Sequence, residues 1–193
     1  EKEMDTNRYS NFIPVNPDHL PNMPPPLTPN IVKRIQNVNV VFKLEYLMPS
    51  GSFKDRGTYI TIAKLKEDGI KKVCLDSSGN AAISLALYAK SEGIETHVFI
   101  PEGISKNKKK ILDILGPKVH KISGTRMNVH EEALKFKKAE YVSHWFNPFF
   151  IEGTKISAYE IGERMDIDQV IVPTGSGTLF FGLFKGFKEL KDL

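Results

Sequence analysis

The stretch KKVCLDSSGNAAISLALYAKSEGIETHVFIP, residues 71–101, predicts one complete strand–helix–strand unit. Lys71–Asp76 has the short apolar run of a buried strand, and Asn80–Glu92 has the length of a helix that Gly93 ends. Glu95–Pro101 then forms a second strand. Because two successive strands joined through a helix run parallel, this unit predicts a parallel sheet.

The same alternation of strands and helices continues on both sides of this unit. Toward the N-terminus the pattern predicts a strand over Val38–Leu44 and a helix from Phe53 to about Glu67. Toward the C-terminus it predicts strands over 118–123, 141–144 and 168–173, which alternate with helices over 105–115, 127–139, 151–165 and 178–190. The whole pattern indicates an α/β fold with a mainly parallel sheet that helices cover on both faces.

Composition narrows the class of protein. The 193 residues are 40% apolar, which suffices for one large domain or two small ones. The formal net charge of +4 is only mildly basic, and no nucleic-acid-binding module is visible, so we expect a small anionic ligand and no nucleic acid. No apolar run is long enough to cross a bilayer and no signal peptide stands at the start, so we expect no membrane partner and a cytoplasmic protein.

Three residue types add further expectations. Cys74 is the single cysteine, which excludes an internal disulfide, and its place in an apolar strand predicts a buried thiol. The five histidines share no metal-ligand spacing, so we expect no metal site. Residues 1–30 are polar and rich in proline, which predicts an extended arm and not a packed element.

The segment PSGSFKDRG, residues 49–57, places a lysine in an unusual position. Ser52 and Asp55 have the spacing of a capping box, which predicts a helix start at Phe53 and puts Lys54 in the first turn. A cation there is unfavourable by about 0.3–1 kcal/mol, because it lies at the positive end of the helix dipole. The same field lowers the pKa of an amine and favours its nucleophilic form. The position therefore fits either a catalytic lysine or a structural one.

Two loops that follow predicted strands carry groups suited to an anion. Asp76-Ser77-Ser78-Gly79-Asn80 and Gly175-Ser176-Gly177-Thr178 each open a helix, where free amides, hydroxyl groups and glycines surround an anion readily. In parallel sheets, ligands bind at the carboxyl ends of strands, where both loops are expected. The second loop lacks the third glycine of a dinucleotide-binding motif, because Phe180 stands there. Taken alone, each loop also fits a plain strand–helix connection.

The order of these three features resembles the fold type II pyridoxal-phosphate enzymes, and within them the threonine synthase family. The similar segments are PSGSFKDRG (49–57), SSGNAA (77–82), NPFFIEGTKISAYEI (147–161) and VPTGSGTLFFGLFKGFKEL (172–190). They span nearly everything after the proline-rich arm.

The resemblance implies a tryptophan-synthase-β-like fold with two three-layer, parallel-sheet domains. A large cofactor-phosphate domain, incomplete in this chain, is expected from residues 31–50 and 145–193. A small substrate-side domain is expected from residues 51–144. The resemblance also implies a homodimer.

The resemblance further implies roles for individual residues. Lys54 is expected to hold pyridoxal 5'-phosphate as a Schiff base and to move protons on the substrate carbons. Asn80 is expected to contact the ring oxygen of the cofactor, while Ser77 and Ser78 face the carboxylate of a small amino-acid substrate. The residues expected to hold the cofactor phosphate are Gly175, Ser176, Gly177, Thr178 and Leu179. The implied reaction converts O-phosphohomoserine to threonine and phosphate.

Two departures from the family pattern bear on the reaction. Relatives continue beyond the position of Leu193, with further strands and a hydroxyl residue that meets the pyridine nitrogen, so we expect a fragment or an incomplete site. Phe150 replaces the family's substrate-phosphate arginine, with His144 and Trp145 just upstream, and an apolar group disfavours a dianion there. The alternatives are a threonine or serine dehydratase-like enzyme, a cysteine-synthase-like β-eliminating enzyme, and a truncated inactive domain.

Overall fold

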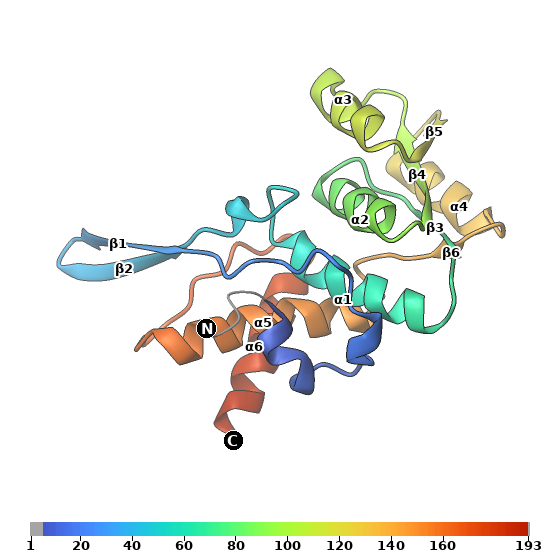
Figure 1. The fold of residues 1–193 in the computed structure, drawn as a ribbon. Helices are drawn as coiled ribbons and strands as arrows, with labels where there is room; N and C mark the ends of the chain where they lie inside the picture. Colours follow the sequence, from blue (N-terminus) through green and yellow to red (C-terminus); the bar gives the residue numbers. More distant parts are fainter. Residues whose placement is uncertain (1–5, 193) are drawn as a thin grey trace.

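The parallel sheet predicted from residues 71–101 is present in the computed structural model, which describes residues 6–192 (Figure 1). A sheet of four parallel strands has the order β5-β4-β3-β6. The strands are β3 (Lys72–Leu75), β4 (Glu95–Pro101), β5 (Lys118–Ile122) and β6 (Glu140–Tyr141). The helices between them are α2 (Asn80–Ser91), α3 (Lys106–Leu115) and α4 (Arg126–Lys135). We call these strands and helices the sheet unit.

The central strands of the sheet unit bury side chains on both faces. In β3, Val73 and Leu75 belong to the main apolar core, which includes side chains of α2, whereas Cys74 belongs to a smaller core with α4. In β4, Val98 also joins the main core and Phe99 the smaller one. This alternation follows from the two-residue period of a strand. Helices therefore cover both faces of the sheet, which confirms the α/β prediction.

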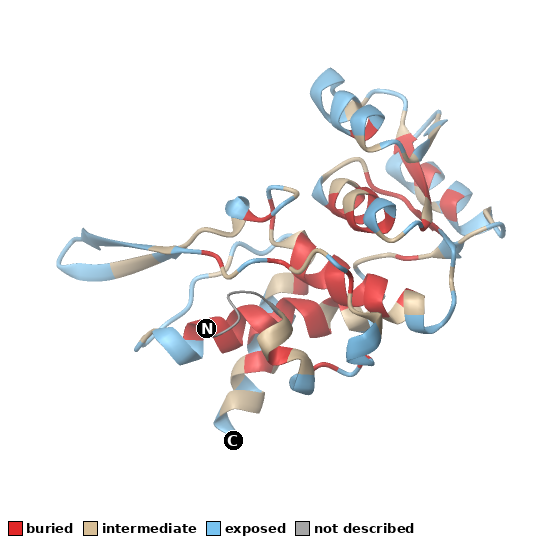
Figure 2. Cartoon of the chain, in the orientation of Figure 1, coloured by how far each residue is buried: buried red, intermediate tan, exposed pale blue. Residues whose placement is uncertain are grey.

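The remaining helices pack against one another and form what we call the helical unit. Its members are α1 (Lys54–Glu67), α5 (Pro148–Arg164) and α6 (Thr178–Lys191). Figure 2 shows buried residues along most of α1 and α5. The two helices approach so closely that a Cβ on Gly153 would lie 2.0 Å from the backbone oxygen of Arg56, a contact that only glycine permits. Because α1 contacts both α2 and α5, it joins the helical unit to the sheet unit.

The N-terminal segment is packed, so the prediction of an unpacked arm over residues 1–30 is wrong for its described part. Tyr9, in the 3₁₀ helix η1 (Thr6–Phe12), is 3% exposed, and Ile13 and Val15 are also buried in the main core. The Tyr9 hydroxyl donates a hydrogen bond to Glu163 of α5 at 3.0 Å. A few apolar side chains are enough to fasten a polar, proline-rich segment to a core. A second short 3₁₀ helix, η2 (Pro17–His19), follows.

A β-hairpin follows this segment, and the sequence indicated only its second strand. β1 (Asn30–Ile35) pairs antiparallel with β2 (Val38–Lys43). Gln36 and Asn37 connect the strands with φ values of 46° and 66°, as a two-residue hairpin turn of type I′ requires. The hairpin extends away from the helices in Figure 1. The 3₁₀ helix η3 (Glu45–Leu47) leads from it toward α1.

The predicted strand over 168–173 is wrong, because no strand forms there among residues 6–192. Ile171, in the middle of the segment, is 91% exposed. A strand needs a neighbour for its backbone N–H and C=O groups, and no described strand pairs with this segment. The apolar pattern alone therefore does not suffice to predict a strand. None of the helices in the described part of the chain is both long and apolar enough to span a membrane.

Candidate functional site

Lys54 is the first residue of α1, and Phe53 is the N-cap residue. The predicted capping box is wrong, because no side chain caps this helix and the buried Ser52 hydroxyl has no hydrogen-bond partner among the described residues. Asp55 instead accepts hydrogen bonds from the Ser50 backbone N–H, at 2.7 Å, and from the Ser50 hydroxyl. A fully buried carboxylate is better satisfied by these two donors than by one amide. Lys54 nevertheless keeps its first-turn position.

The Lys54 ammonium group faces hydroxyl groups and aromatic rings. Its Nζ donates to Thr178 Oγ1 at 3.3 Å and to Ser176 Oγ at 3.4 Å. The rings of Phe53 and Phe150 have their centroids 4.4 and 5.5 Å from Nζ. Burial lowers the pKa of Lys54 to about 8. An amine with this pKa is neutral, and thus nucleophilic, in a larger fraction of molecules at neutral pH than an ordinary lysine.

The glycine loop, residues 175–178, presents its hydroxyl groups to Lys54. Gly177 has a φ of +80°, a left-handed conformation that favours glycine, and it is the N-cap residue of α6. The hydroxyl groups of Ser176 and Thr178 lie 3.1 Å apart. Thr154 of α5 donates to the backbone oxygen of Thr178 at 3.1 Å and so fastens the loop to the helical unit. The Lys54 amine therefore lies close to two hydroxyl groups and to the start of α6. These groups together suit the binding of an anion.

The second predicted loop, residues 77–80, opens α2 in the sheet unit. Ser77 is buried, and its hydroxyl accepts a hydrogen bond from the Gly79 N–H at 3.3 Å. Ser78 is half-buried, and Asn80 is exposed as the first residue of α2. Lys54 has direct contacts with the glycine loop. The roles of Ser77, Ser78 and Asn80 stay predictions.

A polar cluster around Asp76, which no sequence motif indicates, holds this second loop. The Asp76 carboxylate accepts a hydrogen bond from the Tyr141 hydroxyl and lies 3.2 Å from His130 Nδ1. Arg126 donates to the backbone oxygen of Asp76 at 2.7 Å. Burial, together with the bond to Asp76, raises the pKa of Tyr141. The partners lie 50 to 65 positions from Asp76, so no local spacing could have revealed them.

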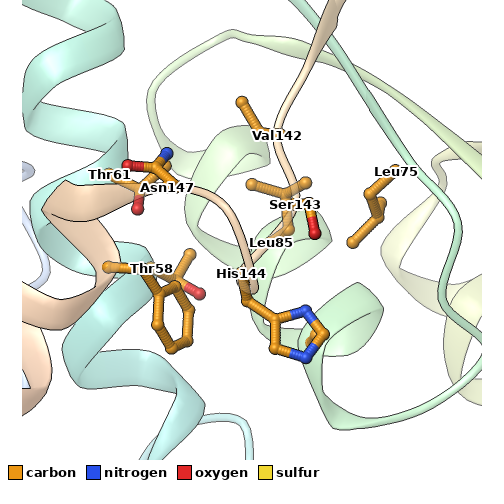
Figure 3. A pocket seen from close by; sticks show the side chains of 10 residues that line it. Thr58, Thr61, Leu75, Leu85, Val142, Ser143, His144 and Asn147 are labelled. Atoms are coloured by element: carbon orange, nitrogen blue, oxygen red, sulfur yellow. The ribbon is translucent and has the colours of Figure 1, made fainter. Parts of the chain in front are cut away.

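A small cavity lies next to the site (Figure 3). Its volume is about 10 Å³, which is room for about one water molecule. Phe150 and His144 line it, and their rings lie 5.8 Å apart. Burial, with a smaller contribution from the Lys54 charge, lowers the pKa of His144 to about 4. The other lining residues are Thr58, Thr61, Leu75, Ala81, Leu85, Val142, Ser143 and Asn147.

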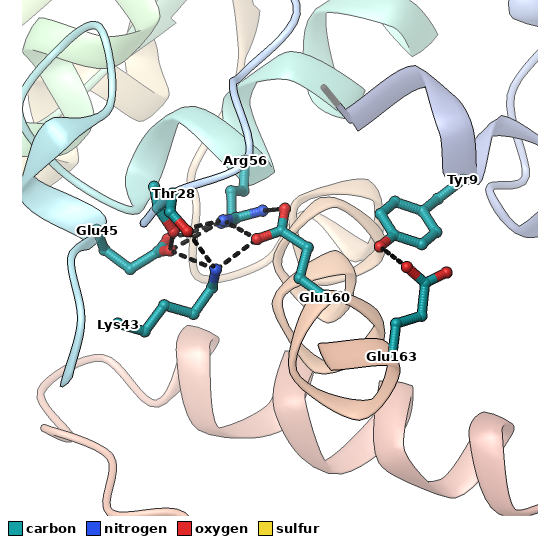
Figure 4. A network of polar contacts seen from close by, with 7 residues as sticks. All are labelled: Tyr9, Thr28, Lys43, Glu45, Arg56, Glu160 and Glu163. Carbon is teal, nitrogen blue, oxygen red and sulfur yellow. Dashed lines mark hydrogen bonds and ion pairs between the residues drawn. The ribbon is translucent and has the colours of Figure 1, made fainter. Parts of the chain in front are cut away.

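Arg56, two residues after Lys54, is completely buried and fixes the start of α1 (Figure 4). Its guanidinium group binds both carboxylate oxygens of Glu160 on α5, at 2.5 and 2.8 Å, and both oxygens of Glu45, at 2.6 and 2.9 Å. Lys43 of the hairpin adds a contact of 2.5 Å to Glu160. Although burial opposes ionisation, the Arg56 charge holds the pKa of Glu45 below its ordinary value. The network joins the hairpin, α1 and α5 beside Lys54.

Comparisons with known proteins find a family that this chain matches. A family model described as "Pyridoxal-phosphate dependent enzyme" matches residues 23–193. The threonine synthase of Methanocaldococcus jannaschii is 33% identical over 168 residues, which cover 84% of this chain and 42% of that protein. The serine racemase of Arabidopsis thaliana is 32% identical over 173 residues, which cover 86% of this chain and 52% of that protein.

A solved structure extends the likeness to the fold. The processed form of threonine deaminase isoform 2 from Solanum lycopersicum has a TM-score of 0.80 with this chain at 25% sequence identity. The match covers 87% of this chain and 49% of that structure. The chain thus spans about half the length of the relatives that it matches.

Proposed function

This chain belongs to the family of pyridoxal-phosphate-dependent enzymes, and from that premise we propose that Lys54 attaches the cofactor in a lyase that acts on a small amino acid. The observation that carries the proposal is the approach of Lys54 Nζ to Ser176 Oγ and Thr178 Oγ1, at 3.4 and 3.3 Å. These contacts join an amine to an anion-binding loop from which the sequence separates it by more than 120 positions.

The residues present fit pyridoxal phosphate. Its phosphate group needs hydrogen-bond donors, which the hydroxyl groups of Ser176 and Thr178 and the free amides at the start of α6, including that of Leu179, supply. Apart from Gly175 and its chain neighbours, no atom of residues 6–192 lies within 4 Å of the place where a Cβ on Gly175 would stand, so a phosphate has room to approach the backbone there. The buried Ser52 hydroxyl, without a partner among the described residues, offers a further donor two positions before Lys54.

The chain's own groups suit the chemistry of this cofactor. When bound, pyridoxal phosphate supplies an electron sink that weakens bonds at the substrate carbons. The lowered pKa of Lys54 favours the neutral amine, the form that would hold the cofactor aldehyde and that, when released, would accept a proton. In this proposal Ser77 and Ser78 bind the substrate carboxylate and Asn80 contacts the ring oxygen of the cofactor. Asn80 begins α2 and the two serines lie just before it, near the free backbone amides of the helix start, which supports these roles.

Two reactions of this class are candidates. The first is that of threonine synthase, which releases phosphate from O-phosphohomoserine, and a relative of that name supports it. The second is β-elimination from serine or threonine, as in a dehydratase. The apolar ring of Phe150, 5.5 Å from Lys54 Nζ, favours the second. The homodimer, the cytoplasmic location and the boundaries of the two predicted domains stay predictions.

Retention of the cofactor tests the proposal. The purified protein is incubated with pyridoxal phosphate, dialysed and examined by visible absorption spectroscopy. We expect the unchanged protein to retain the absorbance of the bound cofactor and the Lys54→Ala variant to lose it. Lys64→Ala is the matched control, because Lys64 lies on the same helix and pairs with Asp68 at the surface. Retention by both variants alike would contradict the proposal.

A further inference from the structure

The cavity beside Lys54 is lined by uncharged side chains. Hydroxyl groups, an amide and the imidazole of His144 are its polar members, and no lysine, arginine, aspartate or glutamate of residues 6–192 lines it (Figure 3). Its volume of about 10 Å³ holds about one water molecule and leaves no room for a phosphoryl group. The cavity itself therefore offers an anion neither a positive charge nor space.

Phe150 forms the part of the cavity lining that faces Lys54. It is 3% exposed, and its ring lies so close to Gly57 that a Cβ there would come within 2.5 Å of it. The same ring has its centroid 5.5 Å from Lys54 Nζ. Because the ring packs against α1 at Gly57, its freedom to move away from a substrate is limited.

His144 also lines the cavity and adds no charge to it. Its ring packs 5.8 Å from that of Phe150. Burial, with a smaller contribution from the Lys54 charge, lowers the pKa of His144 to about 4, so the ring is neutral at neutral pH. A neutral imidazole can exchange a hydrogen bond with a hydroxyl group, but it does not balance the charge of a phosphate.

Three cations at or near the site are engaged with other groups. Lys54 attaches the cofactor under the proposed function. Arg126, whose side chain is 58% exposed, donates to the backbone oxygen of Asp76 at 2.7 Å and lies 3.4 Å from its carboxylate. Arg56 is completely enclosed by Glu45 and Glu160. A phosphate next to Phe150 would therefore be desolvated without a counter-charge.

We propose that Phe150, together with His144, determines specificity by admitting a small uncharged side chain and disfavouring a phosphorylated one. The inference rests on the proposed function. Of its two candidate reactions, it selects elimination from a neutral hydroxy amino acid. Phe150 acts here by what it excludes, since a buried aromatic ring replaces water around the substrate and cannot pair with a dianion.

Ligand titrations of the cofactor-loaded protein test this inference. L-serine, L-threonine and O-phospho-L-homoserine are added in turn, and the change in the visible spectrum of the bound cofactor reports binding. We expect half-saturation with serine or threonine at a concentration at least about tenfold lower than with O-phosphohomoserine. Equal or tighter binding of O-phosphohomoserine overturns the inference and leaves the proposed function intact. Failure to take up the cofactor overturns the proposed function, and this inference with it.

Substitutions test whether Phe150 causes the preference for an uncharged substrate. Phe150→Arg is expected to improve the half-saturating concentration of O-phosphohomoserine by about tenfold or more without improving that of serine. Phe150→Leu is expected to keep the preference of the unchanged protein. Phe146→Arg is the matched control, because Phe146 is 74% exposed and does not line the cavity. An equal gain from Phe146→Arg overturns the inference. If Phe150→Arg does not fold, as its thermal melting would show, the titration of the unchanged protein still decides.

Discussion

The helical unit and the sheet unit hold their loops in different ways. In the helical unit, buried charges fix the start of α1: the side chains of Arg56 and Glu160 are 0% and 1% exposed. In the sheet unit, the comparable pair is Arg126 and Asp76, and the Arg126 side chain is 58% exposed. The position of Lys54 therefore depends on a network whose central ion pair is fully buried, whereas the loop at residues 77–80 depends on a cluster that water reaches.

The largest expected effect is the loss of the buried charge in the helical unit. Arg56→Leu leaves the Glu160 carboxylate buried without its bidentate partner, so we expect the free energy of unfolding to fall by about 3–5 kcal/mol. The matched change in the sheet unit is Arg126→Leu, for which we expect a loss within about 1 kcal/mol because the pair is partly exposed. Urea denaturation measures both. Equal losses would remove the distinction between the two units.

The sheet unit was the easier half to predict from the sequence. β4 has the predicted bounds, Glu95–Pro101, and α2 begins at the predicted Asn80, because apolar periodicity and a nearby glycine are local signals. The segment 168–173 has the same apolar pattern, yet it forms no strand. This segment shows that strand formation depends on a neighbouring strand to pair with, and not on the apolar pattern of its own residues alone.

The three helices of the helical unit were predicted, but the contacts that join them to residues distant in sequence were not. Arg56 and Glu160 stand 104 positions apart, and Tyr9 packs in a segment whose composition indicated a free arm. The site was predicted in part. Lys54 and the glycine loop were predicted from local motifs, and their contact is present. The capping box failed because Asp55 found two donors on Ser50, a choice that spacing alone does not show.

A second prediction compares one buried hydroxyl group in each unit. Thr178→Val removes a hydroxyl next to Lys54, and a lost hydrogen bond to a charged group costs about 1.5–3 kcal/mol, so we expect the dissociation constant of pyridoxal phosphate to rise roughly ten- to hundredfold. Thr96→Val makes the same change at a buried position of β4 and is expected to leave cofactor binding unchanged. Fluorescence titration of the cofactor measures both constants. An unchanged constant for Thr178→Val would argue against the glycine loop as the phosphate site.

A third prediction concerns pH and has the smallest expected effect. Because burial lowers the pKa of Lys54 from 10.5 to about 8, its neutral form accumulates as the pH rises through about 8. We therefore expect the rate of cofactor attachment to rise between about pH 7 and 9 and then to level off. Stopped-flow absorbance at a series of pH values measures this rate. A rate that keeps rising toward pH 10.5 would mean that an exposed lysine reacts.

The central claim is that Lys54 of the helical unit attaches the cofactor, and the most direct test is to find the attached residue. The cofactor-loaded protein is reduced with borohydride, digested and examined by peptide mass spectrometry. We expect a single pyridoxyl-phosphate adduct, on Lys54. An adduct confined to another lysine, such as those of Lys106–Leu115 in the sheet unit, would contradict it.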